Sequence, residues 1–136
     1  MPFDQLGLEF HHVGVACANL ELETAAFRTL GYAPDGQDFV DPAHGVRGRF
    51  LVGGGPRLEL LVPLPGSGVL QPWTSRGIRM YHMAYETSSL TDDLRRLQDD
   101  RARLVSPPTP AVAFGGRPVA FVVLPTLQLI ELIAAG

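Results

Sequence analysis

Two histidines and two glutamates of this 136-residue chain occur at matching points in two similar stretches of sequence. His12 and His82 each lie near the start of a short apolar stretch, and Glu59 and Glu131 each lie inside a later one. About 47 residues separate His12 from Glu59, and about 49 separate His82 from Glu131. The same residue types, in the same order and at nearly the same spacing, indicate an internal repeat.

These four side chains have the chemistry of a metal site. Each lies among apolar neighbours in an expected strand, where burial of an unpaired carboxylate is costly. A bound divalent cation removes that cost, and two imidazoles with two carboxylates form a nitrogen and oxygen set suited to a first-row divalent ion. Any one of them alone would more often be a structural side chain. The joint pattern favours one metal ion held by His12, Glu59, His82 and Glu131.

The other candidate residues are expected to lie outside this site. Alternate residues of a strand face opposite sides, so His11 should point away from the face that carries His12. His44 falls in a turn, where it is either solvated or at the mouth of a pocket. Cys17 is expected in the core. Gly53–Gly55 is expected in a hairpin turn, because it lacks the Lys-Ser/Thr and the helix of a phosphate-binding loop.

The elements that would position the four residues repeat as well. The first half predicts a strand, a helix capped by Asn19, an extended stretch interrupted at Pro34–Gly36 and a hairpin; the ranges are 9–17, 19–30, 32–40, 46–52 and 57–62. The second half predicts a strand, a helix capped by Ser88 or Ser89, a short strand ended by prolines and two further strands; the ranges are 80–86, 88–101, 103–105, 118–124 and 127–134. Each half is therefore β-α-β-β-β.

The chain is expected to form a single domain of two such modules, over about 8–63 and about 79–134. A linker over about 64–78, rich in Pro, Gly and Ser, joins them and contains a candidate short helix at 69–73. Whether the modules pair within one chain or between chains is left open.

Composition excludes several classes of function. Apolar residues make up 46% and charged residues 18%, as in an ordinary globular chain. The net charge of −3 gives no basic footprint, so nucleic acid is not an expected partner. The single cysteine, Cys17, allows no intramolecular disulfide and fits a reducing cytoplasm. No signal peptide is expected, and no apolar run is long enough to span a membrane.

Several short motifs, taken in order, resemble the vicinal oxygen chelate superfamily, which includes glyoxalases and bleomycin resistance proteins. They are His12-Val-Gly-Val-Ala, Gly45-Val46, Glu59-Leu-Leu-Val-Pro-Leu, His82-Met-Ala, Gly115-Gly116 and Ile130-Glu131-Leu. Within the superfamily they are most similar to the methylmalonyl-CoA epimerase family. The resemblance covers nearly the whole chain.

The resemblance implies an α+β fold in which two paired βαβββ modules form curved sheets around a metal-containing cleft. It implies that His12, Glu59, His82 and Glu131 hold one divalent ion (cobalt, zinc, nickel, manganese or magnesium), and it implies a homodimer. The expected function is that of a metal-dependent isomerase or lyase that exchanges an α-proton through a metal-stabilised enolate, as in a methylmalonyl-CoA epimerase. The expected substrate is a small molecule such as an acyl-CoA thioester, and Glu131 is the expected catalytic acid or base.

Two other functions are weighed against this one. A metal-free protein that sequesters a small molecule, in the manner of bleomycin resistance, would have no need of the four ligands. An extradiol-type dioxygenase would use His12, His82 and Glu131 and leave Glu59 without a role. The sequence also departs from the epimerase pattern. Gly48 stands where some relatives carry a second catalytic glutamate, and the last turn, Pro125–Gln128, is shorter than in the family and has no lysine. Tyr81 replaces the first histidine of the pair that usually precedes the second half's ligand.

Overall fold

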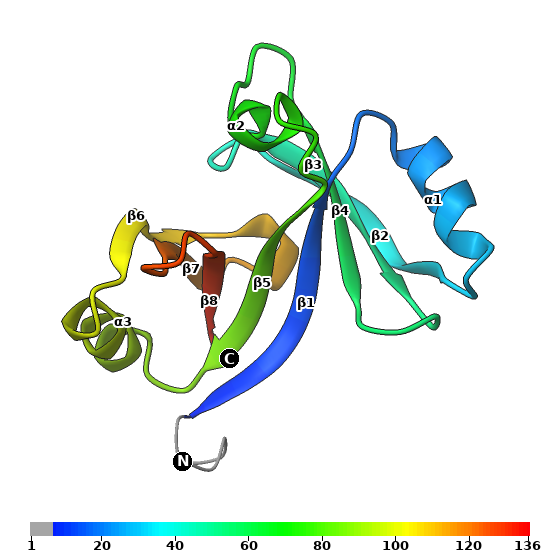
Figure 1. The fold of residues 1–136 in the computed structure, drawn as a ribbon. Coiled ribbons are helices and arrows are strands. Elements are labelled where there is room, and N and C mark those ends of the chain that lie inside the picture. Colours follow the sequence, from blue (N-terminus) through cyan, green and yellow to red (C-terminus); the bar gives the residue numbers. More distant parts are fainter. Residues whose placement is uncertain (1–6) are drawn as a thin grey trace. The chain divides into compact units, whose positions relative to one another are not determined.

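The computed structural model describes residues 7–136, which form the mixed α+β fold that the sequence predicts (Figure 1). This part of the chain contains eight strands and three α-helices, with one short 3-10 helix. In chain order they are β1 (Leu8–Ala16), α1 (Leu20–Arg28), β2 (Ala33–Asp41), β3 (Val46–Val52), β4 (Leu58–Pro63), α2 (Gln71–Thr74), β5 (Met80–Thr87), α3 (Leu90–Asp99), β6 (Arg103–Pro110), η2 (Val112–Phe114), β7 (Pro118–Val123) and β8 (Leu129–Ala134).

The described residues divide into two compact units. The N-terminal unit is His12–Tyr81, and its strands follow the order β2-β3-β4-β1. The C-terminal unit is His82–Gly136 together with residues 7–11, and its strands follow the order β5-β8-β7-β6. Each unit therefore has a parallel pair at one end of its strand order, β1 with β4 or β5 with β8, and two antiparallel strands beyond it. The repeat of β-α-β-β-β along the sequence is a repeat of topology.

The core of the N-terminal unit lies between α1 and one face of the sheet. Its residues come from three elements. Val15 lies in β1 and Cys17 directly follows that strand, and both pack with Leu58 and Leu60 of β4 and with Leu20 of α1. Because alternate residues of a strand face opposite sides, this packing turns His12 and Glu59 to the other face.

The C-terminal unit uses the same arrangement. Ile130 and Leu132 of β8 pack against Leu94 of α3 and against Ala120 and Val122 of β7. Glu131 lies between Ile130 and Leu132 in sequence, so alternation turns its side chain to the face that α3 does not cover. In both units the apolar residues that hold the helix thus fix which face carries the glutamate.

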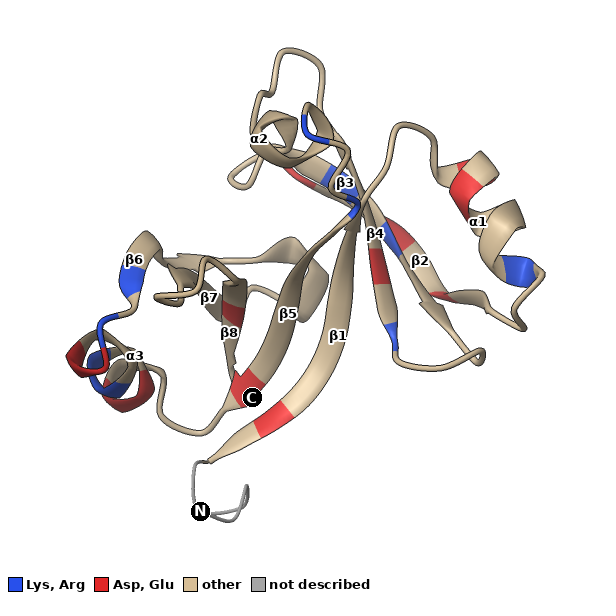
Figure 2. Ribbon diagram, in the orientation of Figure 1, with Lys and Arg blue, Asp and Glu red and all other residues tan. Residues whose placement is uncertain are grey.

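Each long helix begins at a polar residue predicted to cap it. The Asn19 side chain accepts a hydrogen bond from the Leu22 backbone N–H at 2.9 Å. Ser89 precedes α3 but makes no such bond to the helix backbone. There Thr87 accepts from the Ser89 N–H at 3.0 Å and donates to the buried Asp93 carboxylate. Figure 2 shows acidic residues at the start of α1 and a basic residue at its end, an order that the helix dipole favours.

Two strands continue through residues that the sequence predicted would interrupt or end them. β2 runs through Pro34–Gly36 with a shift of register between Asp35 and Phe39. β6 continues from Arg103 through its prolines to Pro110, again with shifts of register. Both are edge strands, at the ends of the strand order, so each pairs with one neighbour only. An edge strand tolerates proline because one side of its backbone needs no partner.

The remaining predicted elements lie close to their expected places. β3 and β4 form the hairpin around Gly53–Gly55, and the short helix after the hairpin is α2 at Gln71–Thr74. The segment 112–114 is a turn of 3-10 helix. Among residues 7–136, no helix combines the length and the apolar character needed to cross a membrane. The module boundaries predicted from the sequence stay a prediction.

Candidate metal centre

His12 and Glu59 form a buried pair in the N-terminal unit. β1 and β4 are parallel, and Glu59 lies opposite Gly14, two residues after His12. His12 and Glu59 therefore share a face, and the His12 Nε2 lies 3.0 Å from the Glu59 Oε1. The two residues are 0% and 4% exposed.

His82 and Glu131 form the equivalent pair in the C-terminal unit. β5 and β8 are parallel, and Glu131 lies opposite Ala84, again two residues after the histidine. The His82 Nε2 lies 3.3 Å from the Glu131 Oε1, and the residues are 3% and 4% exposed. The two pairs thus have the same strand order, the same register and the same participating nitrogen.

A phenylalanine that the sequence analysis missed completes each pair. Phe50 lies opposite Glu59 on β3 and meets the His12 ring edge-on, with centroids 5.6 Å apart. Phe121 lies opposite Glu131 on β7 and meets the His82 ring at 5.5 Å in the same orientation. The signal was present in the repeat, because each phenylalanine precedes its glutamate by nine or ten residues.

The burial and atom types of these side chains suit a metal. A buried carboxylate loses its hydration, and a cation or a hydrogen-bonded partner must replace that stabilisation. Two imidazole nitrogens and two carboxylates offer a nitrogen and oxygen donor set. Among the described residues, the buried histidine and glutamate of each unit, His12 with Glu59 and His82 with Glu131, are of the types that could serve as metal ligands.

The two other histidines lie in different surroundings. His11 contacts the Phe114 ring edge-on at 5.4 Å, and its Nε2 lies 4.0 Å from Glu86, which also accepts from Arg117 at 2.9 Å. His44 lies in the turn after β2, next to Asp41. Neither belongs to the group that could hold a metal among residues 7–136.

Gly48 is enclosed by its neighbours on β2 and β4. A Cβ built at this position would lie 2.4 Å from the Phe39 Cζ, 2.7 Å from the Leu60 carbonyl oxygen and 2.8 Å from the Leu61 Cδ2. Gly48 itself has no group that carries a proton. The packing therefore leaves no room for the glutamate that the resemblance places there in some relatives.

Cys17 packs in the core, as predicted. Burial raises the pKa of its thiol, although Arg79 and the Leu61 backbone act in the opposite direction. The sulfur also donates a hydrogen bond to the Leu61 carbonyl oxygen at 3.4 Å. These contacts give Cys17 a structural role in the N-terminal unit.

Two βαβββ units, each with a buried histidine and glutamate on the face opposite its helix, define a class of proteins built from a duplicated module. Residues 11–121 match the family described as the Glyoxalase/Bleomycin resistance protein/Dioxygenase superfamily. The chain belongs to this superfamily.

The relatives narrow this assignment. The chain is 31% identical over 115 residues to the ethylmalonyl-CoA/methylmalonyl-CoA epimerase of Cereibacter sphaeroides, covering 82% of this chain and 84% of that one. It is 30% identical over 124 residues to the mitochondrial methylmalonyl-CoA epimerase of Bos taurus, covering 88% and 69%. Its structure is similar to that of the methylmalonyl-CoA epimerase from Mycobacterium tuberculosis, with a TM-score of 0.76, 25% identity and coverage of 93% and 87%. The chain is thus an epimerase-like member of the superfamily.

Proposed function

We propose that the chain is a divalent-metal-dependent isomerase that exchanges the α-proton of an acyl-CoA thioester. The observation that carries the proposal is the duplicated buried pair, His12 with Glu59 and His82 with Glu131. Two curated relatives at about 30% identity are named as epimerases of malonyl-type CoA thioesters, which supports this class of substrate. Dimerisation and a cytoplasmic location stay predictions.

The proposal assigns the metal to all four residues of the buried group. Their donor set fits a first-row divalent ion and leaves coordination positions for water or substrate. When bound, such an ion acts as a Lewis acid that lowers the cost of removing a proton next to a carbonyl. Cobalt, zinc, nickel, manganese and magnesium all remain compatible with these ligand types.

Glu131 is the proposed acid or base. Its carboxylate is buried, and a base must be held within hydrogen-bond distance of the proton that it removes. The packed position of Gly48 supplies no second carboxylate, so a group at another position, or water, must return the proton from the opposite side in an epimerisation.

Metal content and proton exchange together test the proposal. The purified protein should carry about one divalent ion per chain, and the His12→Ala/Glu131→Ala double variant should lose it. Wild type should exchange the α-proton of methylmalonyl-CoA in deuterated water, whereas Glu131→Gln should lose most of this exchange. Glu9→Gln, which alters an exposed carboxylate on β1, should behave as wild type.

Two results would contradict the proposal. One is the absence of bound metal after reconstitution with cobalt or zinc, which would leave the four residues with a structural role and favour a metal-free binding protein. The other is a metal-loaded protein that leaves the α-proton of every acyl-CoA tested unexchanged.

A further inference from the structure

Tyr81, near the start of β5, belongs to an apolar cluster of the N-terminal unit. The other members of the cluster are Ala16, Val46, Leu61, Leu70 and Phe39. Leu61 follows Glu59 by two residues on β4, and Ala16 follows His12 by four residues on β1. Because alternate residues of a strand face opposite sides, Leu61 shares a face with Glu59 and Ala16 shares a face with His12. Tyr81 therefore packs on the face of its unit that carries His12 and Glu59.

The same cluster closes the position of Gly48. Gly48 lies opposite Leu61 on the neighbouring strand, and Phe39 and Leu61 occupy the space that a side chain at this position would need. Their hydrocarbon side chains have no proton to transfer. Among the six residues of the cluster, all in the described part of the chain, the hydroxyl of Tyr81 is the one side-chain group that can donate or accept a proton.

Trp73 of α2 restricts the orientation of the Tyr81 ring. The two ring centroids are 5.2 Å apart, and the ring planes are inclined by 50°. Both side chains are half-buried, so Tyr81 is held by the cluster and by Trp73 while part of its surface stays accessible. An acid or base must be held in position but must also be reachable by the substrate, and Tyr81 meets both conditions.

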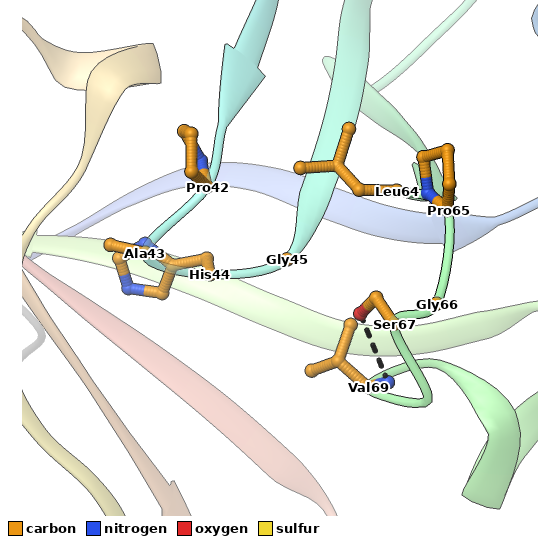
Figure 3. A pocket seen from close by; sticks show the side chains of 9 residues that line it. All are labelled: Pro42, Ala43, His44, Gly45, Leu64, Pro65, Gly66, Ser67 and Val69. Atoms are coloured by element: carbon orange, nitrogen blue, oxygen red, sulfur yellow. Dashed lines mark hydrogen bonds between the residues drawn. The ribbon is translucent and has the colours of Figure 1, made fainter.

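The cluster adjoins a pocket of about 490 Å³ within the same unit. The Pro42–Gly45 turn and residues of the Leu64–Val69 segment line this pocket (Figure 3). Val46 and Leu70 of the cluster directly follow Gly45 and Val69 in the chain. The pocket is large enough to hold water, so solvent next to the cluster can replace a proton that a side chain has given up.

We propose that Tyr81 is the second proton-transfer residue of the epimerisation, in place of the glutamate for which Gly48 leaves no room; this inference rests on the proposed function. In one direction the α C–H bond breaks, its proton passes to the Glu131 carboxylate and its electron pair delocalises into the thioester carbonyl. The O–H bond of Tyr81 then breaks, and its proton forms a new C–H bond on the opposite side of the α-carbon. Water returns a proton to the Tyr81 phenolate and takes one from Glu131. The two residues exchange roles in the reverse direction.

The test separates inversion at the α-carbon from proton exchange. A single epimer of methylmalonyl-CoA is incubated in deuterated water with protein loaded with Co²⁺ or Zn²⁺, and deuterium uptake and conversion to the other epimer are followed separately. Wild type should show both. Tyr81→Phe, which removes only the hydroxyl and keeps the ring against Trp73, should slow conversion about 10²- to 10⁴-fold. With this variant one of the two epimers should still take up deuterium, with retention of configuration.

Two kinds of control accompany this variant. Tyr85 lies four residues further along β5 and packs against the helix core of the C-terminal unit, so Tyr85→Phe should convert the epimers as wild type does. Trp73→Leu removes the ring that contacts Tyr81 and should lower the ratio of conversion to exchange, whereas Trp73→Phe should restore most of it. Circular dichroism and metal content should be the same for all variants.

The outcomes separate this inference from the proposed function. Conversion at the wild-type rate by Tyr81→Phe would overturn the inference and leave the proposed function standing. A wild type that exchanges the α-proton without converting the epimers would do the same. Loss of exchange with both epimers in a folded, metal-loaded Tyr81→Phe protein would refute the assignment of Tyr81 to the second proton transfer. A wild type that exchanges no α-proton would refute the proposed function and the inference with it.

Discussion

At the scale of single residues, the same small set of contacts occurs twice. A histidine, a glutamate two positions further along on the parallel neighbour and a phenylalanine opposite that glutamate recur in both units. The rings of Phe50 and Phe121 cover one side of the histidines and restrict their orientation. A ligand set needs such support, because side chains that rotate freely lose the geometry a metal requires.

Gly48 offers a prediction about packing at this scale. Gly48→Ala should destabilise the protein by about 1–3 kcal/mol, because its Cβ would meet Phe39, Leu60 and Leu61 at sub-contact distances. Urea denaturation measures the change. Gly68→Ala is the matched control, since a Cβ there would meet only the Gln71 Oε1 at an ordinary 3.6 Å. A Gly48→Ala variant as stable as the control would show that β2 and β4 yield easily at this point.

At the scale of elements, Arg49 joins three of them. From β3 it donates to both carboxylate oxygens of Asp38 on β2 at 2.8 Å, and to Glu21 and Thr24 of α1 at 2.7 and 2.9 Å. These bonds lower the pKa of both Glu21 and Asp38 and raise that of Arg49. The ion pairs of Arg49 therefore hold α1 against β2 and β3, in addition to the apolar core.

The pH dependence of stability follows from these shifts. A carboxyl group whose pKa is lower in the folded than in the unfolded protein stabilises the fold. This stabilisation is fully present when the pH is above the group's ordinary pKa, which is 4.5 for Glu21 and 3.8 for Asp38. This contribution is lost as the pH falls through the lowered values. Arg49→Met should therefore lower the urea midpoint at pH 7, and the gap to wild type should narrow at about pH 2.5.

Arg103→Met, at an exposed position on β6, should show no such pH-dependent gap. If the gap between Arg49→Met and wild type is the same at both values of pH, the ion pairs contribute nothing and Arg49 acts through packing alone.

The cap of α1 supports a second prediction for an element. Asn19→Ala should cost about 1 kcal/mol of unfolding free energy, because the Leu22 N–H loses its side-chain acceptor. Ser89→Ala at the start of α3 should cost less, because Ser89 makes no side-chain bond to its helix backbone. Chemical denaturation of the two variants, with Asn19→Ser as the conservative control, measures the difference. Equal losses from both alanine changes would contradict the assigned roles of the two caps.

At the scale of the whole molecule, the central question is whether the duplicated pairs act together. If one ion is held by all four residues, it binds the native and not the unfolded chain. At a concentration one hundred times its dissociation constant it should stabilise the fold by about 2.7 kcal/mol. Thermal unfolding with and without Co²⁺ or Zn²⁺ measures this.

Variants of the two glutamates decide between a shared centre and two separate ones. Glu59→Gln changes only the N-terminal unit and Glu131→Gln only the C-terminal unit, yet each should remove most of the metal-dependent stabilisation. Calorimetry should show one ion per chain. Two ions per chain, with each substitution removing one of them, would mean that the pairs bind independently and would refute the four-ligand site.

Much of the fold could be predicted from short-range patterns in the chain. The strand around His12 and the helix after Asn19 follow from residue periodicity and capping, which are properties of neighbours in sequence. The recurrence of a histidine and a glutamate at one spacing indicated an internal repeat, and the order of elements in the structure confirms a duplicated βαβββ architecture. Alternation along the first strand was enough to predict that His11 and His12 face opposite sides.

Other features depend on which strands become neighbours, and no local pattern encodes that. The prolines of β6 predicted that the strand would end there. Because β6 is an edge strand, one side of its backbone needs no hydrogen-bond partner and the prolines are tolerated. The enclosure of Gly48, the three-element network of Arg49 and the ring contacts of Phe50 and Phe121 all arise from register between strands. The pairing of Asp41 with His44 was within reach of the sequence, three residues apart. The position of this pair beside the Leu64–Val69 segment could not be predicted from the sequence, because tertiary folding alone brings that segment to the turn.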